Sequence, residues 1–228
     1  IVTSRDFRFQ EQHSVQVSEI MTPKEKLITA REGESPDVIK ALLQVNRIEK
    51  ILLVDDSFAL TGLVTLKDIN KSLDFPNATR DEEGRLLAGA AIGTKADTLD
   101  RCEALIEAGV DVLVLDSAHG QSEGVLKQIK AVKSTFKDTQ ILGGNIATGE
   151  GALALVEAGA DAVKVGIGPG SICTTRIVTG VGVPQVSAVA EVTSALHKKD
   201  IPIIADGGIR FSGDIAKAIA AGGHTVML

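Results

Sequence analysis

The sequence predicts an α/β protein, most of it a parallel sheet covered by helices, and three observations lead to this prediction. From about residue 80 onward, apolar segments of strand length alternate regularly with helical segments. The joints between helix and strand repeat, as EAGVDVLVLD, EAGADAVKVG and AAGGHTVML. Polar residues such as Asp116, Asn145 and Asp206 stand where strands of this kind would end. Strand and helix in strict alternation are typical of parallel sheets.

The composition excludes several classes of function. The chain has 228 residues, of which 44% are hydrophobic and 24% charged, as in ordinary globular proteins. No apolar run approaches the ~20 residues of a membrane helix, and charged residues occur among the first ten, so we expect a cytoplasmic protein without a membrane partner. With a net charge of −6 and no dense basic cluster, nucleic acid is not an expected partner.

The first 75 residues contain an internal repeat. The opening IVTSRDFRF resembles LVTLKDINK at 63–71, which predicts one complete unit over about 15–75 and the end of a preceding unit over 1–14. Within the complete unit, Ser35 followed by Pro36 and Asp37 predicts the start of a helix. The apolar strands ILLV and LVT follow that helix.

This unit resembles the CBS module, a small α/β unit that usually works in pairs and often binds adenine or guanine nucleotides. The resemblance implies that a nucleotide such as ATP or GTP faces Thr3, Asp6, Thr65 and Asp68. The residues themselves leave a second interpretation open, in which each aspartate only caps the helix that follows it.

Six strands are expected in the second part of the chain. A glycine just past each of three helices, at Gly109, Gly159 and Gly222, favours a left-handed end to the helix. The strands are expected within LLAGAAIG, VDVLVLDS, QILGGNI, DAVKVGIG, IPIIADGG and HTVML.

The polar residues at the ends of successive strands favour a (β/α)₈ barrel over an open sheet. A barrel carries its site on the rim formed by the carboxyl ends of all strands, whereas an open sheet concentrates such residues at one switch point. We therefore predict a barrel over 76–228. Since a barrel has ~250 residues, we expect it to be incomplete here, with at least two strands outside this segment and the CBS pair inserted into it.

The segment VGIGPGSICTTR at 165–176 carries the most specific chemistry. Its glycines and Pro169 predict a tight loop that presents Cys173 beside Thr175 and Arg176. A cation or well-placed N–H groups near an accessible thiol would favour its thiolate. A lone cysteine is nevertheless more often a small buried hydrophobic residue, so the loop alone does not establish catalysis.

Further motifs accompany this loop: LDSAHG, GGNIAT, IVTGVGVPQ and IADGGIRFSGDIAKA. Together they resemble the IMP dehydrogenase family over the whole chain. The resemblance implies oxidation of IMP to XMP by NAD⁺, the committed step of guanine nucleotide synthesis. Cys173 would add to C2 of the purine, hydride would pass to NAD⁺, and the thioimidate would be hydrolysed with the help of Thr175.

The resemblance also implies roles for other residues, and a homotetramer. Asp206, Gly207, Gly208 and Ser171 would bind IMP, its ribose at Asp206 and its phosphate at the other three. The cofactor NAD would contact Asp116, Ser117, Asn145, Gly166, Ile167 and Gly168. A potassium ion would bind the backbone carbonyls of Gly168, Gly170 and Cys173.

Three other residues attract attention. Cys102, within a helical segment, is expected to pack in the core. His119 follows a strand and is expected to be a solvated loop residue rather than part of the cofactor pocket. Lys164, inside the apolar strand VKV, either points into the site or forms an ion pair beneath it.

Two other functions stay open from the sequence. One is GMP reductase, which shares the barrel and the cysteine loop with the dehydrogenases. The other is a nucleotide-sensing CBS protein with an inactive barrel.

Overall fold

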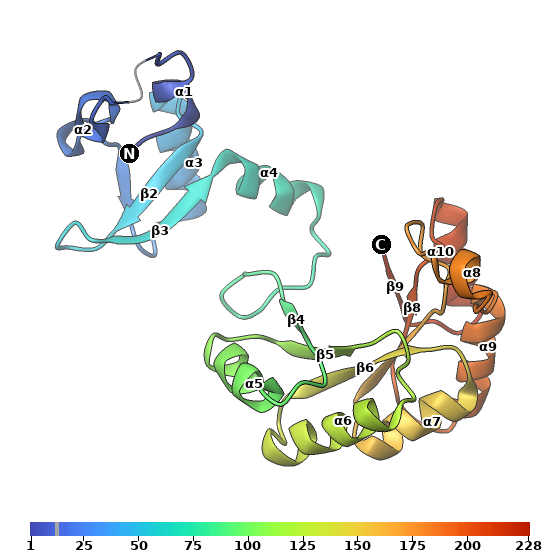
Figure 1. Cartoon of the computed structure of the whole chain (residues 1–228). Helices are drawn as coiled ribbons and strands as arrows, with labels where there is room; N and C mark the ends of the chain where they lie inside the picture. The colour runs from blue at the N-terminus through green and yellow to red at the C-terminus, as the bar shows by residue number, and fades with distance from the viewer. Residues whose placement is uncertain (12–13) are drawn as a thin grey trace. The chain divides into compact units, whose positions relative to one another are not determined.

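The structure is a computed structural model that describes residues 1–11 and 14–228. The chain divides into two compact units, Ile1–Thr79 and Arg80–Leu228 (Figure 1). Each unit has its own sheet and its own hydrophobic core.

The first unit is a three-stranded sheet with helices. Strand β1 (Thr29–Arg31) lies parallel to β2 (Lys50–Val54), and β2 pairs antiparallel with β3 (Leu60–Thr65). Its small core consists of Ala30, Ile39, Leu43 and Ile51. Its helices are α1 (Ser4–Phe7), α2 (Val17–Ile20), the 3₁₀ turn η1 (Lys24–Lys26), α3 (Pro36–Asn46) and α4 (Leu66–Asp74).

Helix α3 begins where the sequence predicts. The Ser35 hydroxyl accepts a hydrogen bond from the Val38 N–H at 3.4 Å, and Pro36 occupies the first turn. The two predicted strands that follow are β2 and β3. The predicted helix start is therefore confirmed. Three residues were enough to predict it because capping is a local interaction.

The second unit is a six-stranded parallel sheet in the order β4-β5-β6-β7-β8-β9. All six predicted strands are confirmed, in sequence order and all parallel. The bounds are β4 (Gly89–Ile92), β5 (Val112–Asp116), β6 (Gln140–Ile146), β7 (Ala162–Val165), β8 (Ile203–Asp206) and β9 (Thr225–Met227).

Helices connect these strands, and Figure 1 shows α6, α7 and α9 in one layer against the sheet. The arrangement is a parallel half-barrel, consistent with a domain of the TIM-barrel type. The predicted glycines at the helix ends adopt left-handed conformations, with φ of 83° at Gly109, 107° at Gly159 and 106° at Gly222. The helices are α5 (Thr98–Glu107), α6 (Glu123–Thr135), α7 (Gly149–Ala158), α8 (Thr175–Thr179), α9 (Gln185–Leu196) and α10 (Ser212–Ala220).

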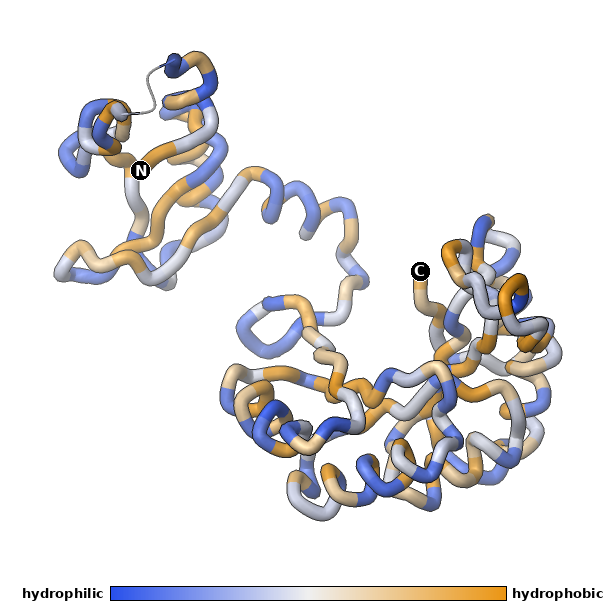
Figure 2. The backbone as a smooth tube through the Cα atoms, viewed as in Figure 1, coloured by the Kyte–Doolittle hydropathy of each residue, from blue (hydrophilic) through white to orange (hydrophobic). Residues whose placement is uncertain are grey.

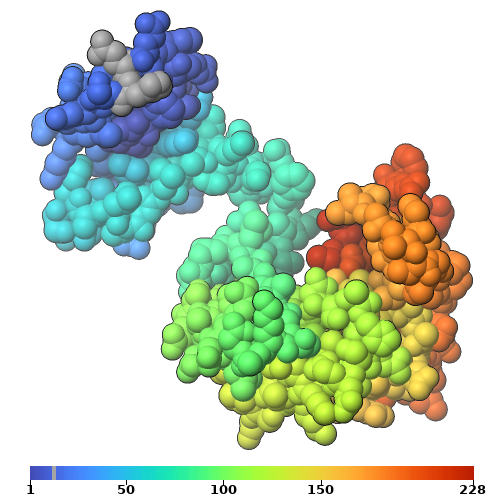
Figure 3. Space-filling view, in the orientation of Figure 1, coloured from blue at the N-terminus to red at the C-terminus, as the bar shows by residue number. Residues whose placement is uncertain are grey.

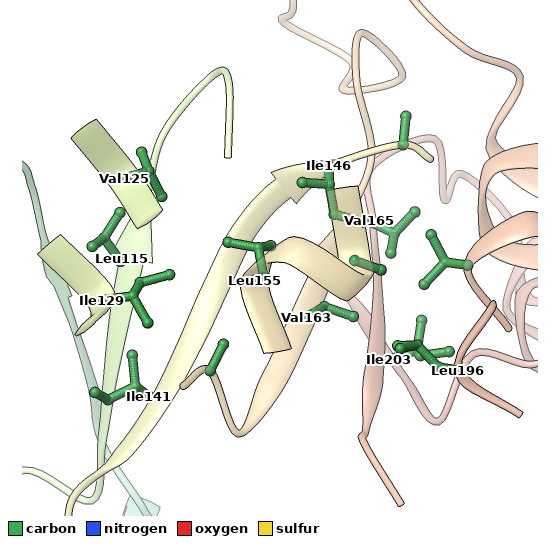
Figure 4. Packing of buried hydrophobic residues seen from close by; sticks show 14 of the residues in the cluster. Leu115, Val125, Ile129, Ile141, Ile146, Leu155, Val163, Val165, Leu196 and Ile203 are labelled. Carbon is green, nitrogen blue, oxygen red and sulfur yellow. The ribbon is translucent and has the colours of Figure 1, made fainter. Parts of the chain in front are cut away.

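The core of this unit lies between the sheet and the helix layer. Leu155 of α7 and Ile129 of α6 meet above Gly143 of β6, where a Cβ would lie 3.1 Å from each side chain (Figure 4). Figure 2 shows the strands mainly in the colour of apolar residues and the helices mixed, as expected when only one helix face is buried. All four residues of β7 are buried, Lys164 among them. Cys102 packs in this core, as predicted.

Within the described ranges, no helix combines the length and the apolar character that crossing a membrane requires.

Candidate active site

Four strands bring polar side chains to the same edge of the second sheet. Asp116 ends β5, Asn145 lies near the end of β6, Lys164 lies in β7, and Asp206 ends β8. Because the carboxyl ends of parallel strands meet at one edge, residues far apart in the sequence become neighbours.

Lys164 forms two ion pairs at this edge. Its Nζ lies 3.1 Å from Asp116 Oδ1 and 2.8 Å from Asp206 Oδ2. The Lys164 side chain is 6% exposed, whereas that of Asp206 is 23% and that of Asp116 54% exposed. Of the two interpretations of this lysine, the ion pair beneath the site is therefore confirmed. The sequence did not predict the two partners of Lys164. It showed only that a charged residue lies inside an apolar strand.

Asn145 connects the same aspartate to the loop after β7. Its Nδ2 donates to the backbone oxygen of Gly166 and to Asp206 Oδ2, both at 2.8 Å. Its Oδ1 is buried, with no hydrogen-bond partner in the described part of the chain. Since a buried acceptor normally has a partner, this atom is suited to a donor on a ligand.

The loop at 165–176 that carries Cys173, here called the cysteine loop, packs closely against the turn after β8. A Cβ on Gly166 would collide with the backbone oxygen of Asp206, and one on Gly207 would lie 3.0 Å from both the nitrogen of Gly170 and Cγ of Pro169. The predicted substrate residues Asp206, Gly207 and Gly208 thus adjoin the loop that carries Cys173.

Two residues hold this arrangement in place: Gln185, which the sequence did not single out, and Arg176, which it singled out only as a cation beside Cys173. Gln185 Nε2 donates to the backbone oxygens of Val165 at 2.8 Å and Asp206 at 3.2 Å, so it ties β7 to β8. Arg176 lies against Gly168 and donates to the backbone oxygen of Val183 at 2.6 Å. Neither residue type indicates such a role in the sequence, because both donate to backbone carbonyls, those of Gln185 lying on distant strands and that of Arg176 seven residues along the chain.

The two cysteines differ in their surroundings. Cys173 is partly exposed, and its Sγ lies 3.3 Å from Thr175 Oγ1. Hydrogen bonds from Thr175 lower the pKa of Cys173, and the positive charge of Arg176 lowers it further. Burial raises the pKa of Cys102. Cys173 is therefore the better nucleophile of the two.

The predicted cofactor residues on the β5 side are joined through the backbone. The Asn145 N–H donates to the backbone oxygen of Ser117 at 2.6 Å, and the Ser117 N–H donates to that of Gly144 at 2.9 Å. The Ser117 hydroxyl accepts from the His119 N–H at 3.3 Å, and the His119 side chain is exposed.

Ser171, in the loop after β7, is exposed. Figure 3 shows the segment after β7, in orange, at the surface of its unit.

The three carbonyls predicted to bind potassium lie in one short loop. The Gly170 oxygen accepts the Cys173 N–H at 3.1 Å, while the oxygens of Gly168 and Cys173 accept no backbone hydrogen bond within the described ranges. Among all residues that the structure describes, no cluster of three or more His, Cys, Asp or Glu side chains could hold a metal ion. Backbone oxygens are the ligands that hard cations take, and potassium sites are known to use them.

Comparison with known proteins supplies the family. A model of the IMP dehydrogenase / GMP reductase domain matches residues 9–228. The chain belongs to the IMP dehydrogenase / GMP reductase family. Over all 228 residues it is 59% identical to the inosine-5′-monophosphate dehydrogenase of Escherichia coli K12, covering 47% of that protein. The corresponding proteins of Halalkalibacterium halodurans and Bacillus subtilis are 55% and 54% identical, with 47% and 46% of their lengths covered. The chain thus spans about half the length of these relatives.

In this member of the IMP dehydrogenase / GMP reductase family, the two repeat motifs of the first unit both form capping boxes. Asp68 Oδ2 accepts from the Thr65 N–H at 3.0 Å and from its hydroxyl at 2.7 Å. Asp6 Oδ2 accepts from the same two groups of Thr3, at 2.6 and 2.9 Å. Both aspartates therefore cap the helix that follows them, and nucleotide binding at these positions stays a prediction.

The two motifs differ in what lies beside them. A cavity of about 370 Å³ is lined by Thr3 and Asp6 together with the basic residues Lys26 and Arg47, whereas Thr65 and Asp68 are not among its lining residues.

Proposed function

We propose that the chain carries the nucleophile and much of the substrate site of an enzyme that oxidises IMP to XMP with NAD⁺, in guanine nucleotide synthesis. One observation carries the proposal: in a member of this family, a cysteine of lowered pKa stands on a loop packed against the turn Asp206–Gly208. The relatives named above are called inosine-5′-monophosphate dehydrogenases, which agrees with this substrate.

The reaction divides into two steps at one sulfur atom. The Cys173 thiolate adds to C2 of the purine, and the hydrogen on C2 leaves as hydride, for which NAD⁺ is the acceptor. The C2–S bond remains as a thioimidate. Water then adds to C2, the C–S bond breaks, and XMP leaves with an oxygen from water at C2 while the thiol is restored. Thr175 stabilises the thiolate before it adds to C2 and again when the C–S bond breaks.

The substrate is held by one carboxylate and by backbone donors. Asp206 would accept hydrogen bonds from the ribose hydroxyls, and the N–H groups of Gly207 and Gly208 with the Ser171 hydroxyl would bind the phosphate. Uncharged donors at a turn before a helix suit a phosphate dianion, which explains how a chain of net charge −6 holds an anionic substrate.

The cofactor would lie along the neighbouring strand ends. Asp116 would bind the nicotinamide ribose, and Ser117, Asn145 and the segment Gly166–Gly168, including Ile167, would line the same space. The buried, unpartnered Asn145 Oδ1 fits a hydroxyl or amide donor of such a ligand. The carbonyls of Gly168, Gly170 and Cys173 would hold potassium, which would fix the shape of the loop.

For the whole protein, we propose a barrel over 76–228 that continues beyond this segment, with a CBS pair inserted at 1–14 and 15–75. The basic residues at the cavity in the first unit suit the phosphates of ATP or GTP. A homotetramer in the cytoplasm stays the prediction for its assembly and location.

The proposal is tested by measuring NAD⁺ reduction with IMP, and NADPH oxidation with GMP, in the full-length protein. We expect the first reaction only, and we expect Cys173→Ala to abolish it while Cys102→Ser retains it. NADPH oxidation with GMP alone would establish a reductase. No turnover of either nucleotide, together with iodoacetamide labelling of Cys173 that IMP does not block, would establish a sensor with an inactive barrel.

A further inference from the structure

Lys164 bonds one oxygen of each neighbouring carboxylate and leaves the other oxygen without a partner within residues 1–11 and 14–228. Lys164 occupies Oδ1 of Asp116, and Lys164 with Asn145 occupies Oδ2 of Asp206. Among the described residues, Asp116 Oδ2 and Asp206 Oδ1 accept no side-chain or backbone hydrogen bond. Each aspartate therefore offers one free oxygen, whose direction is fixed by Lys164 at Asp116 and by Lys164 with Asn145 at Asp206.

The charges at this edge require such a cation. Two carboxylates drawn to one ammonium group would repel each other without it, and Lys164 is almost fully buried, so water cannot screen the pair from that side. Asp116 and Asp206 stand on β5 and β8, which do not pair with each other, while Lys164 stands between them on β7. One side chain thus sets the distance between two carboxylates that the sheet alone does not join.

We infer that Lys164 is a positioning residue that holds both ribose-binding carboxylates at once, so that the cofactor side and the substrate side of the site depend on a single buried cation. This inference rests on the proposed function, which assigns Asp116 to the cofactor ribose and Asp206 to the substrate ribose. In this inference Lys164 acts through the two aspartates to which its Nζ donates, and not by contact with either ligand.

The test is a comparison of steady-state constants for Lys164→Met and Lys164→Arg in the full-length protein. Loss of the cation releases Asp116 and leaves Asp206 held by Asn145 alone, so both acceptors are less firmly directed at the ribose hydroxyls, and a hydrogen bond to a charged group is strong enough that losing it raises KM about tenfold or more. We expect K164M to raise KM for both IMP and NAD⁺ by at least that factor, with a smaller change in kcat, because ribose contacts exist before and during the reaction. K164R, which keeps the charge, should restore both KM values.

A matched control comes from the opposite edge of the same sheet. Lys133 of α6 also bridges elements: its Nζ lies 2.8 Å from Asp161 Oδ2, which accepts the Ile141 N–H as well, at the amino ends of β6 and β7. Lys133→Met should lower thermal stability and leave both KM values at the wild-type level. Should K164M not fold, K164Q keeps neutral N–H donors at the same place and enters the same comparison.

The outcomes separate the inference from the proposed function. If wild-type protein does not reduce NAD⁺ with IMP, the proposed function is wrong. If wild-type protein turns over and K164M changes neither KM or only one of them, the inference alone is wrong. An equal rise of both KM values in K133M would show a general loss of structure and would also overturn it.

Discussion

Substitution of Gly166 by alanine tests whether the contact between the cysteine loop and β8 is needed for function. The added Cβ would overlap the backbone oxygen of Asp206 and lie 3.1 Å from the Asp206 carbonyl carbon and 3.3 Å from Gln185 Nε2. Carbon and oxygen atoms that are not bonded prefer ~3.5 Å or more, so relief requires a shift on the order of an ångström. Because the obstructing atom belongs to the backbone of a strand, a side-chain rotation cannot supply that shift.

The expected cost has two parts. Overpacking of this kind destabilises by roughly 1–3 kcal/mol. An ångström of displacement between a nucleophile and the group that positions its substrate costs about a hundredfold in rate. G166A should therefore lose about a hundredfold in kcat/KM for IMP, while iodoacetamide still alkylates Cys173, because the thiol and Thr175 lie beyond the shifted contact.

A glycine in open space supplies the control. Gly124, in the first turn of α6, has nothing within 4 Å of an added Cβ, so G124A should keep full activity and gain up to ~1 kcal/mol in unfolding free energy. The assay is NAD⁺ reduction at varied IMP, with urea unfolding of both variants. A G166A protein with wild-type kcat/KM would refute the reasoning, since the loop and the strand would then tolerate separation.

Three further substitutions test the thiol, a helix cap and the core. Thr175→Val removes the hydroxyl that lowers the pKa of Cys173, so less thiolate exists at a given pH and the midpoint of the pH profile of alkylation should move to higher pH; an unmoved midpoint would contradict this cause. Asp68→Ala removes a capping box and should cost about 1 kcal/mol of unfolding free energy of the first unit, whereas Asp74→Ala, at the C-terminal end of the same helix, should cost nothing measurable by urea unfolding. Leu155→Ala opens a cavity above β6 and should cost about 2–5 kcal/mol in the same measurement; a loss below 1 kcal/mol would show that the helices close over the gap.

The alkylation experiment needs one labelled thiol and one neutral neighbour. Cys102→Ser provides a background in which Cys173 is the single cysteine of this segment. Thr174→Val is the matched control, because the Thr174 side chain makes no capping hydrogen bond at the start of α8. The profile of T174V should coincide with that of the parent protein.

Local and periodic features of the fold could be predicted from the sequence. The six strands and the left-handed glycines at Gly109, Gly159 and Gly222 depend on side-chain periodicity and on single backbone conformations, both of which are visible in a stretch of ten residues. The sharing of one edge by Asp116, Asn145 and Asp206 followed from the parallel order of the strands. The features that could be predicted therefore depend on a single helix or strand, or on the order of the strands along the chain.

Contacts between distant segments could not be predicted. Lys164 was visibly unusual, yet its pairing with Asp116 and Asp206 depends on the distance between strands and on which face each side chain takes. Gln185 gave no signal at all, because its partners are backbone oxygens of Val165 and Asp206. A glutamine at the start of a helix has many possible partners, and only the packing of α9 against β7 and β8 selects these two.

At the aspartates of the first unit, a structural role leaves room for a binding role. In both capping boxes the threonine groups use Oδ2 alone, so a capping aspartate keeps its second oxygen. Asp6 lines the cavity and Asp68 does not, although each accepts from the N–H and the hydroxyl of the threonine three residues before it. Asp206 follows the same principle in the second unit, with one oxygen held by Lys164 and Asn145. A carboxylate whose first oxygen is fixed by the protein has lost much of its rotational freedom before a ligand arrives, so a hydrogen bond to its second oxygen carries a smaller entropic cost. A hydrogen bond from the protein to one oxygen thus favours ligand binding at the other. An aspartate with one oxygen held in this way is a better candidate for a binding residue than an aspartate with neither oxygen held.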